Sequence, residues 1–448
     1  MVYSIDNGGF WAYASIINGD KANMNRDTLK LVIIDQQADR HLPQEYVPRS
    51  SEAKLNILGN NKEIIVLTGI RRCGKSVLLQ YVLHKNDEEN YYLNFEDDRL
   101  ATFSLSDFQS LQEIFIELYG IQKIYYFDEI QNIEGWELFV RRLYNNGNKI
   151  YITGSNATLF SEELGTRLTG RYIALRIFPF SFYEFLSYQN PKLSNKVNLS
   201  TLDIGEIKNK FGEYIELGGF PEYVKFQQVD YLHSLYESIL YRDIIARYKI
   251  SNSKSIKELI FYLASNCSKE MTFSSLRKLL GLGSVTTISN YCHYLENSFL
   301  CFFVNRYSHS VKTQIVSPKK IYFIDHILAK IIGFRFSEEK GRMLENIVFI
   351  ELKRRGFEIF YHKMNKECDF IIRQANNIVA AIQVCQSLYN EKTKLREIEG
   401  LVEALKHYTL TEGIILTEHE EESFEHQLDN MHFKIHVMPI WKWLIGKF

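Results

Sequence analysis

The sequence lacks any apolar run close to the ~18 consecutive residues that a membrane-spanning helix needs. Its first residues also lack the basic start, apolar block and small-residue cleavage site that mark a signal peptide. Both absences argue against a membrane or secreted protein. We therefore expect a cytoplasmic protein with no membrane partner.

Paired cysteines are also missing. The six cysteines are scattered, and no two of them form a Cys-x-x-Cys pair. This spacing suggests neither a structural zinc site nor a disulfide framework, and it fits a reducing compartment. The positions are Cys73, Cys267, Cys292, Cys301, Cys368 and Cys385.

Neither sign of charge dominates. Lys and Arg number 53 against 54 Asp and Glu, for a net charge of -1. Such a balance gives no overall attraction to nucleic acid or to an anionic membrane, so any basic surface must be local. A hydrophobic content of 46% is typical of a folded chain, and 448 residues are enough for several domains.

Residues 63–79, EIIVLTGIRRCGKSVLL, are the most informative stretch present. An apolar strand leads into the pattern Gly-x-x-x-x-Gly-Lys-Ser, and a helix follows. The glycines allow a tight turn whose N–H groups face a phosphate, and the helix N-terminus favours the same anion. Lys75 would reach the β and γ phosphates and Ser76 would ligate Mg²⁺. The predicted nucleotide contacts are Gly69, Ile70, Arg71, Arg72, Cys73, Gly74, Lys75, Ser76 and Val77.

A second apolar strand ends in two acidic residues, in KIYYFDEIQ at residues 123–131. Asp128 is placed to hold Mg²⁺ through water, and Glu129 can orient and deprotonate the attacking water. Downstream of a phosphate loop this pair predicts hydrolysis of a nucleoside triphosphate.

Two further site residues are candidates with open alternatives. Asn156, with Ser155 second, follows a strand at residues 149–153 and is a candidate γ-phosphate sensor or, equally, a helix N-cap. Arg171 is a candidate for stabilising the charge that develops during phosphoryl transfer, or a surface arginine.

Several motifs in order resemble a group of bacterial and archaeal ATPases related to AAA+ proteins: GIRRCGKS, YYFDEIQ, ITGSNATLF, LTGRY, IFPFSFYEF and GGFPEYV. The resemblance implies ATP as the nucleotide, a five-stranded parallel core, a helical lid, a winged helix and a C-terminal domain of uncharacterised function. It also implies that Pro221 contacts the base or ribose. The residues alone indicate only a turn between two helices at that point.

The expected fold class is therefore α/β, with a P-loop ATPase followed by two further domains. The predicted divisions are a disordered extension at 1–23, the ATPase core at 24–185, the lid at 186–250, a winged helix at 251–335 and a restriction-endonuclease-like domain at 336–448. Met24 is the predicted natural start.

The sequence of the predicted winged helix gives little support for DNA binding. Helices are expected at residues 255–264, 273–280 and 284–296, followed by a β-ribbon at 300–304 and near Ile315. The third helix, which would enter a major groove, contains no Lys or Arg, the residues that most often contact bases and phosphates. A rigid connector is favoured over a DNA reader.

The predicted C-terminal domain resembles a nuclease scaffold with an altered site. Such nucleases need an Asp on one strand and Glu-x-Lys on the next to hold Mg²⁺ and activate water. Asp369 is present, but Gln383 and Cys385 stand at the Glu and Lys positions. We therefore expect no nuclease activity.

The sequence predicts an Mg²⁺-dependent ATPase whose ATP binding and hydrolysis drive or gate rearrangement of the later domains, with an unknown protein client. The alternatives are a low-turnover, nucleotide-gated switch in defence or regulation, and an ATP-dependent DNA-binding or nuclease protein. The oligomeric state, and whether an arginine from a neighbouring copy completes the site, stay open.

Overall fold

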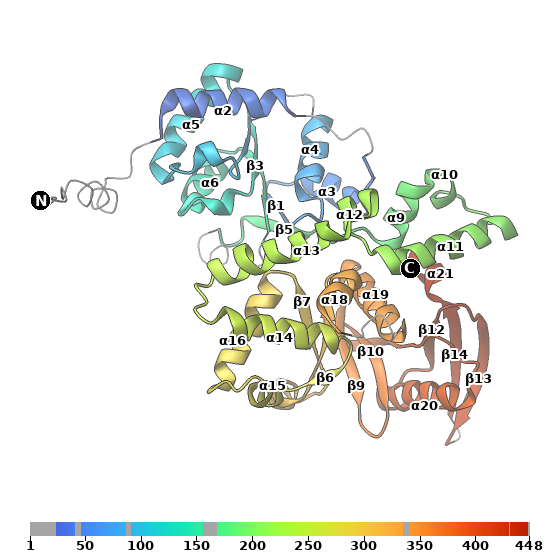
Figure 1. The fold of residues 1–448 in the computed structure, drawn as a ribbon. Coiled ribbons are helices and arrows are strands. Elements are labelled where there is room, and N and C mark those ends of the chain that lie inside the picture. The colour runs from blue at the N-terminus through green and yellow to red at the C-terminus, as the bar shows by residue number, and fades with distance from the viewer. Residues whose placement is uncertain are drawn as a thin grey trace, which may run out of the picture.

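The computed structural model describes residues 24–40, 46–86, 91–155, 168–334, 340–429 and 431–446. The predicted extension at residues 1–23 lies outside these described residues. Figure 1 shows the ATPase core at the top, the helices of the lid across the middle, and two further domains below.

The ATPase core is a sheet of five parallel strands in the order β2-β3-β4-β1-β5. The strands are short, apolar and largely buried, as parallel strands covered on both faces must be. This confirms the predicted five-stranded parallel core. Their bounds are β1 Ile64–Thr68, β2 Tyr91–Asn94, β3 Ile124–Asp128, β4 Lys149–Gly154 and β5 Tyr172–Arg176.

Helices cover both faces of this sheet. Side chains of α2, α5 and α6 form one apolar cluster with alternate strand residues such as Val66 and Phe127. The opposite face, which includes Leu67 and Tyr126, packs against α3 and α4. The alternation follows from the two-residue repeat of a strand. The helices are α2 Arg26–Ala38, α3 Glu52–Gly59, α4 Lys75–Lys85, α5 Phe108–Tyr119 and α6 Trp136–Asn145.

The lid is helical throughout, and its helices begin at recognisable caps. Ser181 and Glu184 form a capping box at the first helix, and Pro221 occupies the first turn of a later one. Gly219 permits the lid to meet the core closely, because a Cβ there would lie 2.3 Å from the Phe180 carbonyl oxygen. The elements are α9 Phe182–Gln189, α10 Pro191–Ser194, α11 Thr201–Leu217, α12 Pro221–Phe226, α13 Val229–Ser238 and a π-helical segment Ile239–Ala246.

The middle domain, residues 251–335, has the three predicted helices and an antiparallel sheet in the order β6-β8-β7. One strand was wrongly predicted near Ile315. Val311–Val316 is helix α17, because the Ser310 side chain caps it by accepting from Thr313 N–H, and the strand lies later, at β8. The winged helix stays an interpretation of this element order. The bounds are α14 Ser253–Ser265, β6 Glu270–Met271, α15 Phe273–Leu279, α16 Val285–Asn297, β7 Cys301–Asn305, β8 Lys319–Phe323 and α18 His326–Ile332.

The C-terminal domain is built on a separate six-stranded mixed sheet in the order β13-β14-β12-β11-β10-β9. The acidic stretch at residues 419–422 runs into edge strand β13, whose charged side chains suit an exposed edge. The bounds are α19 Lys340–Arg354, β9 Glu358–Lys363, β10 Glu367–Gln374, β11 Asn377–Val384, α20 Glu391–His407, β12 Glu412–Thr417, β13 Glu422–Leu428, β14 Met431–Pro439 and α21 Ile440–Ile445.

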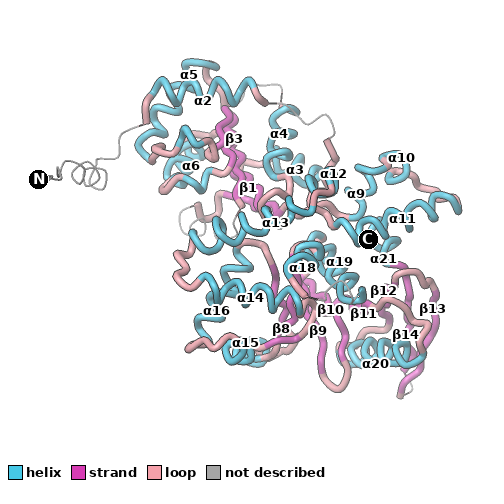
Figure 2. The backbone as a smooth tube through the Cα atoms, in the orientation of Figure 1, coloured by secondary structure: helices cyan, strands magenta, loops and turns pink. Residues whose placement is uncertain are grey.

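The last helix returns to the lid. Helix α21 packs against α9 and α11, with Trp441 and Trp443 buried in the shared core. Figures 1 and 2 both show α21 beside the lid helices. The buried tryptophans therefore join the end of the C-terminal domain to the lid.

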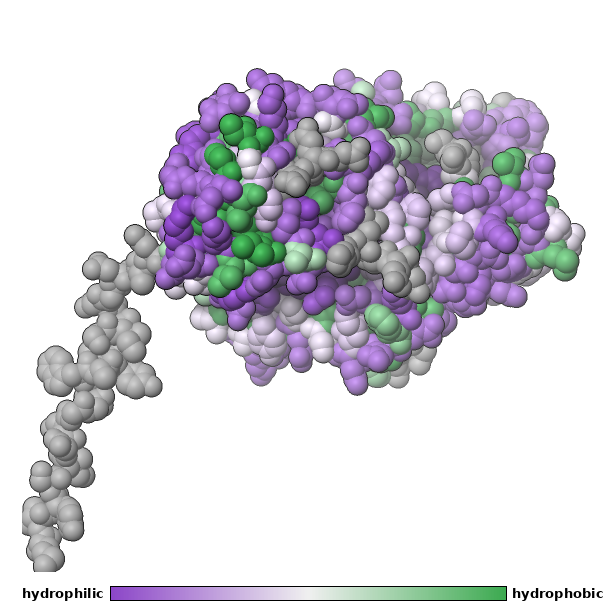
Figure 3. Space-filling model, turned by 90° about the horizontal axis from the view of Figure 1, so that it is seen from above, coloured by the Kyte–Doolittle hydropathy of each residue, from purple (hydrophilic) through white to green (hydrophobic). Residues whose placement is uncertain are grey.

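The outer face of the protein is mostly hydrophilic in the view of Figure 3, with hydrophobic residues in small patches. Within the described residues, no helix is both long enough and apolar enough to span a membrane.

Candidate functional site

The phosphate loop connects β1 to α4 and has a backbone that only glycine can adopt at two points. A Cβ on Gly69 would lie 2.1 Å from the Ile177 carbonyl oxygen, so no side chain fits. Gly74 has a φ of 98° and precedes the first residue of α4, Lys75. The loop therefore leads directly into the N-terminus of α4, an end of a helix that favours an anion.

Lys75 lies buried at the centre of this site, with 4% of its surface exposed. Its Nζ is 3.4 Å from Glu129 Oε1 and donates to the Ile70 carbonyl oxygen at 3.3 Å. Burial alone would lower the pKa of Lys75, but the Glu129 and Asp128 carboxylates raise it above its ordinary value. The ammonium is thus held charged where phosphates would bind.

Ser76 and Asp128 are in direct contact. The Ser76 hydroxyl donates to Asp128 Oδ1 at 3.1 Å, and the Thr153 hydroxyl donates to the same oxygen. Burial, followed by the charge of Glu129, raises the pKa of Asp128 to about 6, against these two hydrogen bonds. A hydroxyl and a carboxylate oxygen beside a phosphate loop are the donor set that Mg²⁺ uses in P-loop proteins.

Glu129 is fixed by the strand beside it. Its N–H donates to Thr153 Oγ1 at 2.9 Å, and the Gln131 amide donates to its carboxylate. Its φ of 51° is unusual for a residue other than glycine, and such backbone strain concentrates at functional sites. Burial would raise the pKa of Glu129, but the charges of Lys75 and Arg71 and the hydrogen bond from Gln131 together lower it.

Thr153 is a site residue that the sequence reasoning missed. It bonds to both acidic residues across the boundary between β4 and β3. Its place at the end of a buried strand, directly before Gly154 and Ser155, is the signal that could have identified it.

The sensor candidates follow β4, which lies between β3 and β1. Asn156 lies outside the described residues. Ser155, the second candidate, is 2% exposed, and its hydroxyl has no hydrogen-bond partner within the described part of the chain. A buried, unpaired hydroxyl at this edge suits a site that binds a polar ligand.

Arg171 lies at the wrong edge of the sheet for the predicted role in its own chain. Its carbonyl accepts from Ile64 N–H at 2.8 Å, at the start of β1, whereas the phosphate loop follows the end of that strand. Because parallel strands begin at one edge and end at the other, the five residues of β1 separate Arg171 from the loop. A contact with nucleotide bound to another copy stays a prediction.

An apolar pocket of about 260 Å³ adjoins the phosphate loop on the lid side. The structure places Pro221 in this pocket, at the start of α12, together with Val77 of the predicted loop set. Its size and apolar lining suit a flat, uncharged ring better than a phosphate. The main lining residues are Tyr46, Val77, Leu78, Phe180, Pro221 and Phe226.

Arg71 ties the phosphate loop to the lid. Its guanidinium lies 3.1 Å from Asp243 in the π-helical segment and 3.0 Å from Glu96 after β2. Arg242 also pairs with Glu96, at 3.1 Å. Burial would lower the pKa of Arg71, but Asp243 and Glu96 raise it. The sequence analysis did not predict a bridge between loop and lid for Arg71.

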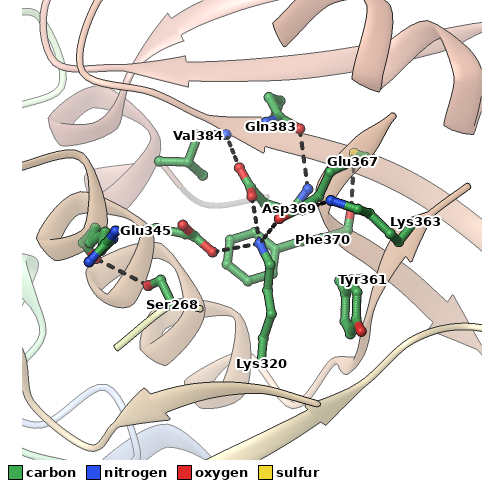
Figure 4. A network of polar contacts seen from close by, with 12 residues as sticks. Ser268, Lys320, Glu345, Tyr361, Lys363, Glu367, Asp369, Phe370, Gln383 and Val384 are labelled. Atoms are coloured by element: carbon green, nitrogen blue, oxygen red, sulfur yellow. Dashed lines mark hydrogen bonds and ion pairs between the residues drawn. The ribbon is translucent and has the colours of Figure 1, made fainter. Parts of the chain in front are cut away.

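The altered nuclease-like site holds a lysine from another domain. Asp369 lies on β10 and accepts from Val384 N–H at 3.0 Å, while Gln383 bonds to Glu397. Lys320, on β8 of the middle domain, places its Nζ among three carboxylates (Figure 4). The distances are 2.8 Å to Asp369, 2.8 Å to Glu367 and 3.1 Å to Glu345.

The Lys320 ammonium thus lies where a metal ion bound by these carboxylates would have to sit. Among the residues that the structure describes, no group of three or more His, Cys, Asp or Glu side chains could hold a metal ion. An ammonium group occupies the space between the carboxylates (Figure 4). The sequence correctly placed Asp369, but it did not indicate a cation supplied from 49 residues earlier.

Comparison with known proteins agrees with the fold and the loop geometry. The model of a family described as an AAA domain matches residues 61–186, so the core belongs to the P-loop ATPases. Models of two domains of unknown function, DUF8612 and DUF4143, match residues 208–337 and 340–443.

Uncharacterised proteins match most of the length of this chain. The chain is 35% identical over 397 residues to "Uncharacterized protein MJ1544" of Methanocaldococcus jannaschii, covering 85% of this chain and 88% of that protein. An uncharacterised protein of Haemophilus influenzae is 35% identical over 335 residues, covering 70% and 81%. The chain belongs to this family of P-loop ATPases with a C-terminal DUF4143 domain.

Among solved structures, the Walker-type ATPase PABY2304 of Pyrococcus abyssi is similar to part of the chain. It is 18% identical, with a TM-score of 0.42, covering 65% of this chain and 97% of that one.

Proposed function

We propose that this protein binds and hydrolyses ATP with Mg²⁺, and that the cycle drives or gates rearrangement of the middle and C-terminal domains for a protein client. The observation that carries the proposal is the meeting of Lys75, Ser76, Asp128 and Glu129 at one phosphate loop. Apart from Ser76, which is exposed, these groups are buried, so charge–charge interactions there are stronger than in water.

Each residue has a separate task in this proposal. Lys75 and the loop N–H groups hold the phosphates, Ser76 and Asp128 hold Mg²⁺, and Glu129 takes a proton from the attacking water. Mg²⁺, when bound, neutralises charge that develops on the phosphates. Lys75 lies 3.4 Å from Glu129, so a phosphate bound to Lys75 would compete with this contact and leave Glu129 to act as a base.

The test of this proposal is ATP turnover by the full chain with Mg²⁺ and after chelation, measured as released phosphate. We expect turnover that falls to background when the metal is removed. Nucleotide binding without any turnover would contradict the hydrolysis proposal. Measuring turnover and molecular mass with and without DNA and ATP would also test nucleic-acid binding and oligomer formation.

A low-turnover switch is the second candidate function, and the Lys75–Glu129 ion pair favours it. While Lys75 binds Glu129, the proposed base is held by the ion pair, and a phosphate must compete for Lys75 to release it. Binding of ATP with turnover that appears only when a partner protein is added would support this candidate.

Pro221→Arg tests the pocket proposed for adenine. A long cationic side chain would fill much of the 260 Å³ space, so we expect ATP affinity to fall about tenfold or more while inorganic triphosphate binds nearly as before. Calorimetry measures both affinities. Val229→Arg, at a position 50% exposed and outside the pocket, is the matched control. An equal loss for both ligands would argue against a base pocket here.

Asp243→Asn tests the link between loop and lid. The substitution keeps the shape of the side chain but removes the charge that pairs with Arg71 at 3.1 Å. We expect turnover to change by roughly three- to tenfold, because truncating one partner of a part-buried charged pair costs more than an exposed pair does. Phosphate release measures it, and Asp230→Asn, on exposed α13, is the control. Unchanged turnover would remove Arg71 and Asp243 from the coupling.

A further inference from the structure

A second cavity, of about 660 Å³, lies where three domains meet, and we refer to it as the junction cavity. The ATPase core contributes Thr68 and Arg176, which are the last residues of neighbouring strands β1 and β5. The middle domain contributes Asn297, at the end of α16, and the C-terminal domain contributes Lys353, in the last turn of α19. Its volume lies in the range of small-molecule sites.

The junction cavity is strongly cationic. Five basic side chains line it against one carboxylate, Glu184. Two of the five are neutralised, because Arg49 lies 3.3 Å from Glu184 and Arg354 lies 2.7 Å from Glu351. The other three make no ion pair within the described part of the chain. They are Lys54, Arg176 and Lys353.

Aromatic rings hold two of these cations close to one another. The Arg176 guanidinium lies 5.2 Å from the ring centroid of Phe299 and 6.0 Å from that of Phe302. Lys353 Nζ lies 5.8 Å from the same Phe302 ring. Aromatic rings attract a cation without accepting its N–H groups as a carboxylate would, so these groups stay available to an anion.

The electrostatics of this pair are unfavourable without an anion. Arg176 keeps part of its surface exposed, yet the surrounding protein lowers its pKa, and burial together with the Arg176 charge lowers that of Lys353. Glu296 opposes both shifts, and Glu358 also opposes the shift of Lys353, but neither carboxylate forms an ion pair with them in the described residues. A bound anion would relieve the repulsion.

Asn297 supplies an independent sign of a ligand. The residue is 7% exposed, and its Nδ2 has no hydrogen-bond partner within the described chain, although it lines the junction cavity. A buried amide donor is rarely left unpaired, because the desolvation cost is not recovered. A ligand oxygen would satisfy it.

We propose that the junction cavity binds a phosphorylated small molecule, with its phosphate held by Arg176 and Lys353 and accepting a hydrogen bond from Asn297. A phosphate carries up to two negative charges and several acceptor oxygens, which match three unpaired cations and an amide better than one carboxylate does. The enclosed volume suits a small ligand such as a nucleotide or a short polyphosphate.

Arg49 connects this cavity to the phosphate loop. It lines the junction cavity, pairs with Glu184 and donates from Nη1 to the Cys73 carbonyl oxygen at 2.9 Å. A ligand that shifts the Arg49–Glu184 pair would therefore act on the loop backbone. Regulation of ATP turnover by this ligand rests on the proposed function, whereas binding itself does not.

The number of inorganic tripolyphosphate molecules bound per chain, measured by calorimetry on the full protein, tests the proposal. We expect two. Arg176→Gln combined with Lys353→Gln should weaken one site by about 100-fold, since each lost charge-assisted contact costs about tenfold. Lys75→Ala should remove only the other site. Lys254→Gln combined with Lys312→Gln, both outside the cavity, removes the same charge as a control.

This experiment can reject either of the two proposed sites without rejecting the other. One molecule per chain, lost only in Lys75→Ala, would overturn the junction cavity and leave the ATP site intact. One molecule per chain, lost only in the Arg176→Gln/Lys353→Gln variant, would support the junction cavity and overturn the ATP site. Should the double variant fold poorly, Asn297→Asp places a carboxylate beside Arg176 and should weaken the same site at least about tenfold. Undiminished binding in Asn297→Asp would also contradict the proposal.

The source of the phosphate is decided by a second set of titrations, made in the Lys75→Ala background. ADP and inorganic tripolyphosphate are compared, each with and without Arg176→Gln. Tighter binding of ADP would identify a nucleotide, and tighter binding of tripolyphosphate a polyphosphate. Binding of neither would overturn the proposal.

Discussion

Glu129→Gln should bind ATP with nearly unchanged affinity but hydrolyse it at least ~100-fold more slowly, as general-base losses do. The amide preserves the size of the side chain and can still bond to Gln131, but it cannot accept a proton from water. Loss of the 3.4 Å contact to Lys75 also removes a competitor for that ammonium. ATP affinity is measured by calorimetry and turnover by phosphate release.

Glu134→Gln is the control for that result, because Glu134 is exposed and lies five residues further along the same chain. It should leave both quantities unchanged. Full turnover in Glu129→Gln would exclude Glu129 as the base. Loss of ATP binding together with turnover would indicate a structural role for the carboxylate instead.

Lys320→Met should destabilise the protein by about 3–5 kcal/mol, the cost of removing one partner from a buried ion pair. Lys320 is 1% exposed, and its ammonium contacts Glu345, Glu367 and Asp369. Burial would lower the pKa of Lys320, but these carboxylates raise it well above its ordinary value. Without the ammonium, three carboxylates face one another. Urea denaturation, followed by fluorescence, measures the loss.

The loss in the free energy of unfolding caused by Lys320→Met should grow as the pH rises from 5 to 8. Burial and Asp369 already raise the pKa of Glu345, and removing the cation raises the carboxylate pKa values further. The folded variant then binds more protons than the unfolded chain in this window, so its stability falls with rising pH.

Lys366→Met provides the comparison for this variant. Its ion pair with Glu399, at 2.6 Å, is exposed, so the loss should stay below about 1 kcal/mol at either pH. Equal destabilisation of the two variants, or a deficit in Lys320→Met that shrinks with rising pH, would show that the buried carboxylates do not depend on Lys320.

The sequence predicts the ATPase core well because its signals are local. The phosphate loop needs glycine at Gly69 for steric reasons, and Asp128 and Glu129 end a strand whose apolar run is unambiguous. Parallel strands bring their carboxyl ends to one edge, so two local motifs are enough to place the site.

The contacts that were missed join residues far apart in the sequence. Lys320 reaches Asp369 across 49 residues, and Arg49 reaches Phe178 across 129. Neither pair has a spacing that a pattern could reveal. The position of Arg171 could not be predicted for a related reason, since a residue type alone does not say at which edge of a sheet it lies. Near Ile315, a side-chain cap at Ser310 outweighed β-branched composition.

The position of α21 has a mechanical consequence. The C-terminal domain leaves the middle domain through α19, and after its last strand α21 rests on α9 and α11 of the lid and also contacts α19. The domain is thus held at both ends of its own sequence. A lid rotation would reach the six-stranded sheet through α21, which packs against β12 and β14, and deleting this helix would remove that connection while sparing every residue proposed to contact phosphate.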